Sequence, residues 1–174
     1  GVLKPDDGGI DTKLKVSYKP QYLDIQSDEI VMSVLSEATQ KYDAQLIRPL
    51  EIRPLLMKPL NTLSGGELQR VMIAKCLSQS ADLYLLDEPS AYLDIEQRLA
   101  FSKVVRDIVE QRGVSILIVD HDLLFIDYLS DRIVVFGGEP AKDGLVTGPF
   151  PMEDGMNKFL PQVGITMRRD QETT

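Results

Sequence analysis

The sequence predicts an α/β fold with a parallel-sheet core, because short apolar strands alternate with helices along the chain. Leu83–Leu86 and Val114–Val119 are continuous apolar runs of strand length, and Ile133–Phe136 is a third. Strands that are apolar throughout are typical of parallel sheets with both faces covered by helices. The helices predicted between them run from Asp94 to about Gln111 and from residue 123 to about 129.

Length and composition limit the class of protein. The chain has 174 residues, of which 43% are hydrophobic and 26% charged, as in a soluble globular domain. No apolar run approaches the ~20 residues of a membrane-spanning helix. The net charge of −8 argues against a general nucleic-acid binder, which needs clustered cations. Arg168-Arg169 is the nearest approach to a basic patch, and a solvated tail is the simpler explanation of this pair.

The cysteine content and the N-terminus give weaker indications of cross-links, of the cellular environment and of where the chain starts within a domain. Cys76 is the single cysteine, so we expect no disulfide framework and no iron–sulfur cluster within this chain. One thiol is compatible with a reducing, cytoplasmic environment. Residues 1–5 have no signal-peptide pattern and no initiator Met, which suggests a start within a domain.

The first third of the chain predicts one strand and several short helical segments. Leu14–Tyr18 alternates in polarity and predicts a strand, which Pro20 ends by removing a backbone donor. Ser27 is placed to cap a helix that continues to about Thr39. Residues 40–63 contain three prolines, so helical pieces there should be short.

The most specific segment is Leu-Ser-Gly-Gly-Glu-Leu-Gln-Arg at residues 63–70, which begins a helix predicted to reach about Ser78. Ser64 and Glu67 have the spacing of a capping box. Gly65 and Gly66 leave bare N–H groups at the positive end of that helix, which is an anion site. A plain helix cap is the alternative, but two glycines cost roughly 1 kcal/mol each relative to alanine.

Two carboxylates, Asp87 and Glu88, directly follow the strand Leu83–Leu86. In an open parallel sheet, ligands bind at the carboxyl ends of the strands. A carboxylate there suits Mg²⁺, and the next one can orient a water for attack on a phosphoryl group. We therefore predict Asp87 as a Mg²⁺ ligand and Glu88 as the catalytic residue, with a solvated turn as the alternative.

Two further polar residues also follow predicted strands. His121 is the only histidine, and it can donate to a phosphate oxygen or hold the attacking water. A purely structural histidine is an equally open interpretation. The amide of Gln21 could reach Mg²⁺ or the water, although this signal is weak by itself.

Together these segments resemble the motifs of ABC-type ATPases. Leu63–Glu67 resembles the signature motif, Leu83–Glu88 the Walker B strand with its catalytic glutamate, and Ser90–Asp94 the D-loop. His121 resembles the switch histidine and Gln21 the Q-loop glutamine. All five occur in the order of that family, which implies an ABC-type domain with a helical signature subdomain at about residues 27–80.

The resemblance is closest to the RNase L inhibitor family of twin-cassette ABC ATPases, which split ribosomes. It covers nearly the whole chain and points to the second cassette. The segments that carry it are Tyr18–Tyr22, Asp87–Asp94 with Glu96–Arg98, Gly155–Asn157 and Gly164–Asp170. It implies a partial nucleotide-binding domain at residues 1–148 and a hinge-like extension at 149–174.

Three departures from the family pattern limit this inference. The chain contains no Gly-x-x-x-x-Gly-Lys-Ser/Thr sequence, so the loop that cradles the phosphates, and with it the N-terminal portion of the domain, is missing. The cysteine-rich iron–sulfur domain and the first cassette are missing as well. Asp120 stands where a glutamate usually precedes the switch histidine.

The resemblance also implies roles for individual residues. Two cassettes of this family meet head to tail with ATP between them, so this chain would contribute to two sites. Nucleotide binding would fall to Ser64, Gly65, Gly66, Glu67 and Gln21. Catalysis would fall to Glu88 and His121, Mg²⁺ binding to Asp87 and Gln21, and coupling at the interface to Asp94 and Tyr92. The implied partners are ATP, a second ABC cassette, the small ribosomal subunit and release-factor-like proteins, with no membrane.

Three other functions stay open at this point. The chain could be a non-catalytic lobe that offers its signature motif to another cassette. It could be the ATPase subunit of a transporter, although Tyr92 in the D-loop argues against that. A chromosome- or repair-type ATPase would carry long heptad repeats before the signature motif, and the stretch between Gln21 and Ser64 has none.

Overall fold

A computed structural model describes residues 13–21, 26–139 and 142–164. The chain divides into two compact units, residues 1–123 and 124–174, which are described separately. The segments 165–166 and 168–170, which carried part of the family resemblance, lie outside the described residues.

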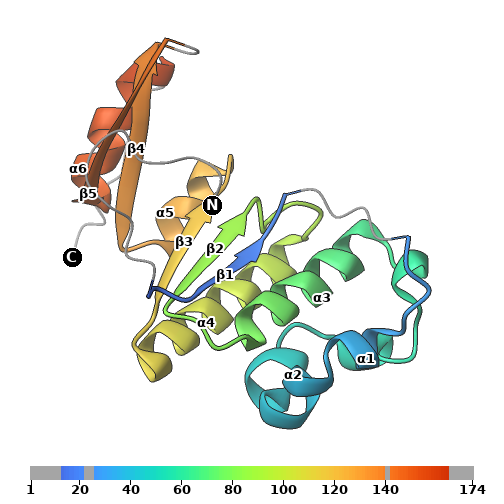
Figure 1. Cartoon of the computed structure of the whole chain (residues 1–174). Helices are drawn as coiled ribbons and strands as arrows, with labels where there is room; N and C mark the ends of the chain where they lie inside the picture. The colour runs from blue at the N-terminus through green and yellow to red at the C-terminus, as the bar shows by residue number, and fades with distance from the viewer. Residues whose placement is uncertain (1–12, 22–25, 140–141, 165–174) are drawn as a thin grey trace, which may run out of the picture. The chain divides into compact units, whose positions relative to one another are not determined.

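The first unit is built on a three-stranded parallel sheet. Its strands are β1 (Val16–Lys19), β2 (Leu83–Asp87) and β3 (Ser115–Val119), in the order β1-β2-β3 (Figure 1). Lys19 pairs with Leu86, and Asp87 pairs with Val119. The predicted α/β class with parallel strands is therefore confirmed, and all three strands end at the same edge.

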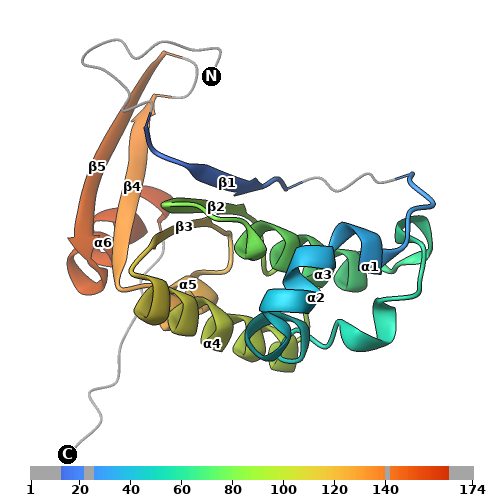
Figure 2. The ribbon, with the colours of Figure 1, turned by 60° about the horizontal axis from the view of Figure 1, so that its bottom comes forward.

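Two long helices cover one face of this sheet. Figure 2 shows α3 (Gly65–Ser78) and α4 (Ile95–Arg112) on the same side of the strands. The strand side chains on that side are buried, as Tyr84 and Leu86 illustrate. The opposite face carries exposed apolar side chains, among them Leu117 and Val119. The expectation that the apolar strands are buried on both faces is thus wrong for the described residues, because both helices lie on one side.

Helix α4 begins and ends as its sequence predicts. Asp94 is the N-cap residue, and Gly113 follows the helix in the left-handed conformation with φ 63°. The buried face of α4 is made by Phe101, Val104, Val105 and Ile108. The apolar pattern of this helix predicts that Leu99 faces inward as well, but Leu99 is 50% exposed. It lies two residues before the buried Phe101 and therefore on the opposite side of the helix.

The segment between β1 and α3 consists of short helical pieces. They are α1 (Val31–Val34), α2 (Ser36–Lys41), η1 (Asp43–Ile47), η2 (Arg53–Leu55) and η3 (Leu60–Thr62). The prediction of short pieces around the prolines is confirmed. The helix expected from residue 28 instead begins at residue 31 and breaks at Leu35, because Ile30 is extended and bridges to Pro59.

The second unit is a hairpin with a helix packed on it. Strand β4 (Arg132–Glu139) pairs antiparallel with β5 (Asp143–Pro151), and α6 (Met152–Phe159) packs against both, followed by η4 (Leu160–Val163). Helix α5 (Leu123–Leu129) agrees with its prediction. The expectation that Ile133–Phe136 joins the parallel sheet is wrong, because this segment pairs with β5.

Helix α6 lies within the segment that the family resemblance assigns to a hinge-like extension. It lies so close to β4 that a Cβ atom on Gly155 would sit 1.6 Å from Ile133 Cγ2. Strand β5 continues through positions 148 and 149. The assignment of residues 1–148 and 149–174 to separate domains stays a prediction. Within the described parts of the chain, no helix combines the length and apolarity required to cross a bilayer.

Candidate nucleotide-binding site

The catalytic glutamate and histidine predicted from the sequence lie side by side at the ends of neighbouring strands. Glu88 follows β2, His121 follows β3 by two residues, and Glu88 Oε2 is 4.0 Å from His121 Nδ1. This distance is too long for a direct hydrogen bond and suits a bridging water or phosphate oxygen. The His121 side chain is 74% exposed and the Glu88 side chain 29%. The pair can therefore meet a ligand that approaches the edge of the sheet.

The backbone at Glu88 adopts an uncommon conformation. Its φ is 45°, in the left-handed region that costs a non-glycine residue roughly 1–2 kcal/mol. The Glu88 N–H donates to the carbonyl of Val119 at 2.7 Å. The Glu88 carbonyl accepts from Gln69 Nε2, also at 2.7 Å. These bonds hold the turn that aims the carboxylate along the sheet edge.

A buried lysine lies beneath the same turn. Lys19 ends β1, is 1% exposed, and donates from Nζ to the carbonyl of Asp87 at 2.7 Å. Burial lowers the pKa of Lys19 to about 8, against the opposing influence of Asp87, Glu88 and Asp120. Sequence reasoning missed both Lys19 and Gln69, because a lone lysine or glutamine gives no sign of being buried.

Asp120 has a structural role that the sequence did not indicate. Its side chain is fully buried and accepts hydrogen bonds from the Ser90 backbone at 3.1 Å and from Ser90 Oγ at 2.8 Å. It also accepts from the Asp122 N–H at 3.0 Å. Asp120 thus joins the end of β3 to the loop after β2, and a longer glutamate would have to bend to make the same bonds.

The donor set at the end of β2 is suited to Mg²⁺ held together with phosphates. Magnesium usually keeps several waters and uses one or two carboxylates plus substrate phosphates. Asp87 is half-buried at the strand end, and its carboxylate accepts from the Tyr18 hydroxyl at 3.4 Å. Gln21 is exposed just after β1, at the same edge. The described residues contain no cluster of three His, Cys, Asp or Glu side chains that would form an all-protein metal site.

The predicted capping box is present at the start of α3. Ser64 Oγ accepts from the Glu67 N–H at 3.3 Å, and Glu67 Oε2 accepts from the Ser64 N–H at 2.8 Å. Lys58 Nζ donates to Glu67 Oε1 at 2.8 Å. Ser64 and Gly65 are exposed, so the positive end of this helix is open to solvent.

The contacts of Glu67 predict how the stability of the chain changes in acid. Hydrogen bonds from Lys58 and from the Ser64 backbone lower the pKa of Glu67 to about 2, from an ordinary value of 4.5. A carboxylate with a lowered folded-state pKa stabilises the fold above its unfolded pKa and loses this contribution as pH falls through the folded pKa. Between about pH 4.5 and 2, Glu67→Gln should therefore flatten the pH dependence of the unfolding free energy.

Urea denaturation at a series of pH values measures this effect. Glu110→Gln serves as the control, because Glu110 is exposed on α4 and far from any helix N-terminus. Equal pH dependence in the wild type and the Glu67→Gln variant would contradict the prediction.

The two glycines of the signature segment also allow the D-loop to approach α3. A Cβ on Gly66 would lie 2.8 Å from the Tyr92 carbonyl oxygen, and one on Gly65 would lie 3.2 Å from Cγ of the Tyr92 ring. Tyr92 has φ 62° and is 81% exposed. Besides baring the N–H groups of the first turn, the glycines thus make space for a neighbouring loop.

This geometry predicts that alanine substitutions at Gly65 and Gly66 change the unfolding free energy by different amounts. Gly66→Ala should lower the unfolding free energy by about 1–3 kcal/mol, because its methyl group meets a backbone atom. Gly65→Ala should change it by less than about 1 kcal/mol, because the Tyr92 side chain can turn away and alanine favours the helix. Thermal and urea unfolding of the two variants measure the difference, and an equal or reversed order would refute it.

The residues predicted to couple two cassettes have defined local contacts. Asp94 Oδ1 accepts from the Gln97 N–H at 2.8 Å and caps α4. Arg98 Nε donates to the Leu93 carbonyl at 3.1 Å, and Arg98 also pairs with Asp122. The bonds of Asp94 and Leu93 fix the D-loop to the start of α4, and the pair with Asp122 joins α4 to the segment after β3. The roles of Asp94 and Tyr92 at an interface stay predictions.

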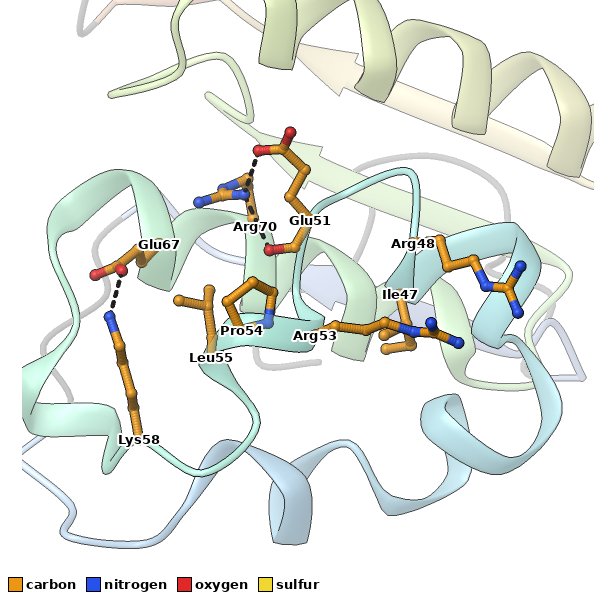
Figure 3. Close-up of a pocket in the computed structure, with 9 residues that line it drawn as sticks. All are labelled: Ile47, Arg48, Glu51, Arg53, Pro54, Leu55, Lys58, Glu67 and Arg70. Atoms are coloured by element: carbon orange, nitrogen blue, oxygen red, sulfur yellow. Dashed lines mark hydrogen bonds and ion pairs between the residues drawn. The ribbon is translucent and has the colours of Figure 1, made fainter.

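A depression of about 560 Å³ lies on the helical segment, away from the strand ends. Figure 3 shows Lys58 turned toward Glu67, and Arg70 toward Glu51, across it. Of the residues predicted from the sequence to form the site, only Glu67 lines it. Its other charged residues, Arg48 and Arg53, pair with Asp43. Because the charged groups of this depression already have ion-pair partners, we place the candidate site at the sheet edge and the start of α3.

Comparison with known proteins shows which proteins this chain resembles. The family model described as ABC transporter matches residues 4–91. An uncharacterized ABC transporter ATP-binding protein of Methanocaldococcus jannaschii is 51% identical over 99% of this chain and 30% of its own length. A solved structure of an archaeal ribosome recycling factor, in complex with a ribosomal stalk protein, is 48% identical. Its TM-score is 0.86, and the match covers 99% of this chain and 34% of that one.

The fold, the strand-end carboxylates and the helix capped by Ser64 define an ATPase domain of the ABC type, and the chain belongs to the ABC transporter family. A second solved structure, of an RNase L inhibitor, is 48% identical with a TM-score of 0.86 over 97% of this chain and 34% of that one. Within the ABC family the chain is a member of the RNase L inhibitor group. It spans about a third of the length of these relatives.

Proposed function

We propose that this chain forms part of an ABC protein that binds and hydrolyses ATP to split ribosomes. The observation that carries the ATPase proposal is the placement of Glu88 and His121 at the ends of adjacent parallel strands, 4.0 Å apart. Asp87 precedes Glu88 at the same edge, where a phosphate chain would approach.

The proposed reaction uses these side chains in distinct ways. The Glu88 carboxylate accepts a proton from the attacking water as the water oxygen bonds to the γ-phosphorus. The bond between that phosphorus and the bridging oxygen of ADP breaks, which releases ADP and phosphate. His121 donates to a γ-phosphate oxygen or holds the water. Asp87 and Gln21 would hold Mg²⁺ together with the phosphates, where the ion neutralises developing charge.

The start of α3 would serve a different ATP molecule. Ser64, Gly65 and Gly66 lie at the positive end of a 14-residue helix, where the N–H groups of the two glycines suit a γ-phosphate presented by a second cassette. Glu67 would support this site by fixing the Ser64 backbone. The chain would thus contribute to two composite sites, with Asp94 and Tyr92 between them.

The ribosome as target is inferred from the relatives. The archaeal relatives that are 48% identical are described as a ribosome recycling factor and as a protein bound to the ribosome with Pelota. We extend this function to the complete protein that contains the present chain, acting in the cytoplasm with the small ribosomal subunit and a release-factor-like protein. Residues 149–174 would act as the hinge segment between two cassettes.

Sucrose-gradient sedimentation tests the ribosomal part of this proposal. The complete protein with ATP and a release-factor-like protein should convert intact ribosomes into subunits, and omission of ATP should prevent this. Active ATP hydrolysis without any conversion would reject the ribosomal function and leave the ATPase assignment intact.

A further inference from the structure

A buried cation lies directly beneath the turn that carries Glu88. Lys19 is 1% exposed, although it stands only two residues before the exposed Gln21. Transfer of an ammonium group out of water is strongly unfavourable unless several hydrogen bonds compensate for it. The reaction described above makes no use of Lys19, so its burial requires a separate explanation.

The partners of Lys19 are backbone carbonyls at the proposed catalytic centre. Its Nζ lies 2.7 Å from the carbonyl oxygen of Asp87 and 3.4 Å from that of Glu88. Gln69, on α3 and 2% exposed, donates to the same Glu88 carbonyl at 2.7 Å. Two buried side chains from different elements, β1 and α3, therefore converge on two consecutive peptide groups.

These two peptide groups determine where the Glu88 carboxylate points. Glu88 has φ 45°, a conformation that a glutamate seldom adopts without support from surrounding bonds. If its carbonyl turned away, the backbone would relax toward ordinary dihedral angles. The Cβ atom would then swing the carboxylate away from His121 Nδ1. Lys19 and Gln69, which donate to the Glu88 carbonyl from buried positions, oppose this rotation of the carbonyl.

The ordinary structural alternative accounts less well for this arrangement. A buried lysine that served the core alone would find its simplest partner in a carboxylate. Ser17 is an example of a buried polar side chain with a structural role. It lies on the same side of β1 and donates to the Cys76 carbonyl at 2.9 Å, away from the strand ends. Lys19 instead contacts the two residues to which magnesium binding and catalysis are assigned.

We propose that Lys19 is a positioning residue for ATP hydrolysis, which with Gln69 holds the Asp87–Glu88 backbone in the conformation that directs the Glu88 carboxylate toward the attacking water. This inference rests on the proposed catalytic role of Glu88. Lys19 touches neither the nucleotide nor the water in this scheme. Its loss should therefore slow the chemical step more than it weakens ATP binding.

Steady-state kinetics of the complete protein tests this role. Lys19→Met should lower kcat by about 10- to 100-fold and change KM for ATP by less than about threefold. Lys19→Gln keeps a donor near the Asp87 carbonyl and should restore part of the rate. Ser17→Ala is the matched control, because it removes a buried polar group from the same strand and face without touching residues 87 or 88.

Hydrogen exchange of the 174-residue chain gives an independent readout. Peptides that cover residues 87–93 should exchange faster in Lys19→Met than in Ser17→Ala, because the Glu88 N–H bond to Val119 loosens. If Lys19→Met does not fold, Lys19→Gln and Gln69→Leu take its place in the comparison with Ser17→Ala. Unchanged exchange and unchanged kcat in these variants would overturn the inference, as would equal kcat losses in Lys19→Met and Ser17→Ala.

The same experiment separates this inference from the proposed function. If Glu88→Gln leaves ATP hydrolysis intact, the catalytic assignment fails and the Lys19 inference falls with it. If Glu88→Gln abolishes hydrolysis while Lys19→Met retains the wild-type kcat, only the positioning role of Lys19 is wrong.

Discussion

Glu88→Gln should reduce ATP hydrolysis by the complete protein at least about 100-fold while ATP still binds. Glutamine has nearly the same shape but cannot accept a proton from the attacking water. The backbone bonds of residue 88, to Val119 and from Gln69, do not involve the side chain and should survive. The variant should therefore fold normally and accumulate in an ATP-bound state.

Phosphate release in single-turnover and steady-state assays measures this loss. Glu96→Gln is the control, because Glu96 is an exposed acidic residue in the first turn of α4, eight positions further along. A Glu88→Gln protein that keeps more than half of the wild-type rate would exclude Glu88 as the base.

The isolated 174-residue chain should not turn over ATP and should bind it at least about 100-fold more weakly than the complete protein. The chain contains no Gly-x-x-x-x-Gly-Lys-Ser/Thr loop, which would supply several charge-assisted hydrogen bonds to the β- and γ-phosphates. Loss of two such bonds at about 1.5 kcal/mol each already accounts for a factor of this size. Asp87 and Gln21 alone offer too few ligands to compensate.

Calorimetric titration with Mg–ATP and a phosphate-release assay on the purified chain test this expectation. Addition of a cassette that carries the missing loop provides the comparison, since it should restore nucleotide binding at the start of α3. Hydrolysis by the purified chain alone that disappears in Glu88→Gln would refute the prediction.

Features that depend on neighbouring residues were predictable from the sequence. The capping box of Ser64 and Glu67, the cap at Asp94 and the left-handed Gly113 all follow from patterns within four residues. The meeting of Glu88 and His121 also followed, because parallel neighbouring strands end at a common edge. Local patterns together with one rule of sheet topology were sufficient for these features.

Features that depend on distant partners were not predictable. Ile133–Phe136 has the composition of a buried parallel strand, and only the pairing of β5 makes it half of a hairpin. β5 itself contains Gly144, Gly148 and two prolines, which conceal its strand pattern. In the sequence, nothing distinguishes Lys19 from an ordinary surface lysine; its burial depends on Gln69 and the turn after β2, which lie far away along the chain.

The contact between Gly66 and the Tyr92 carbonyl has a consequence for sequence change over evolutionary time and in protein engineering. A mutation that enlarges residue 66 is tolerable only if the loop at residues 90–94 changes its path at the same time. We therefore expect the two segments to change together. An engineer who grafts the Ser64–Glu67 segment onto another cassette should transfer Ser90–Asp94 with it, because either half alone would meet a backbone shaped for a different partner.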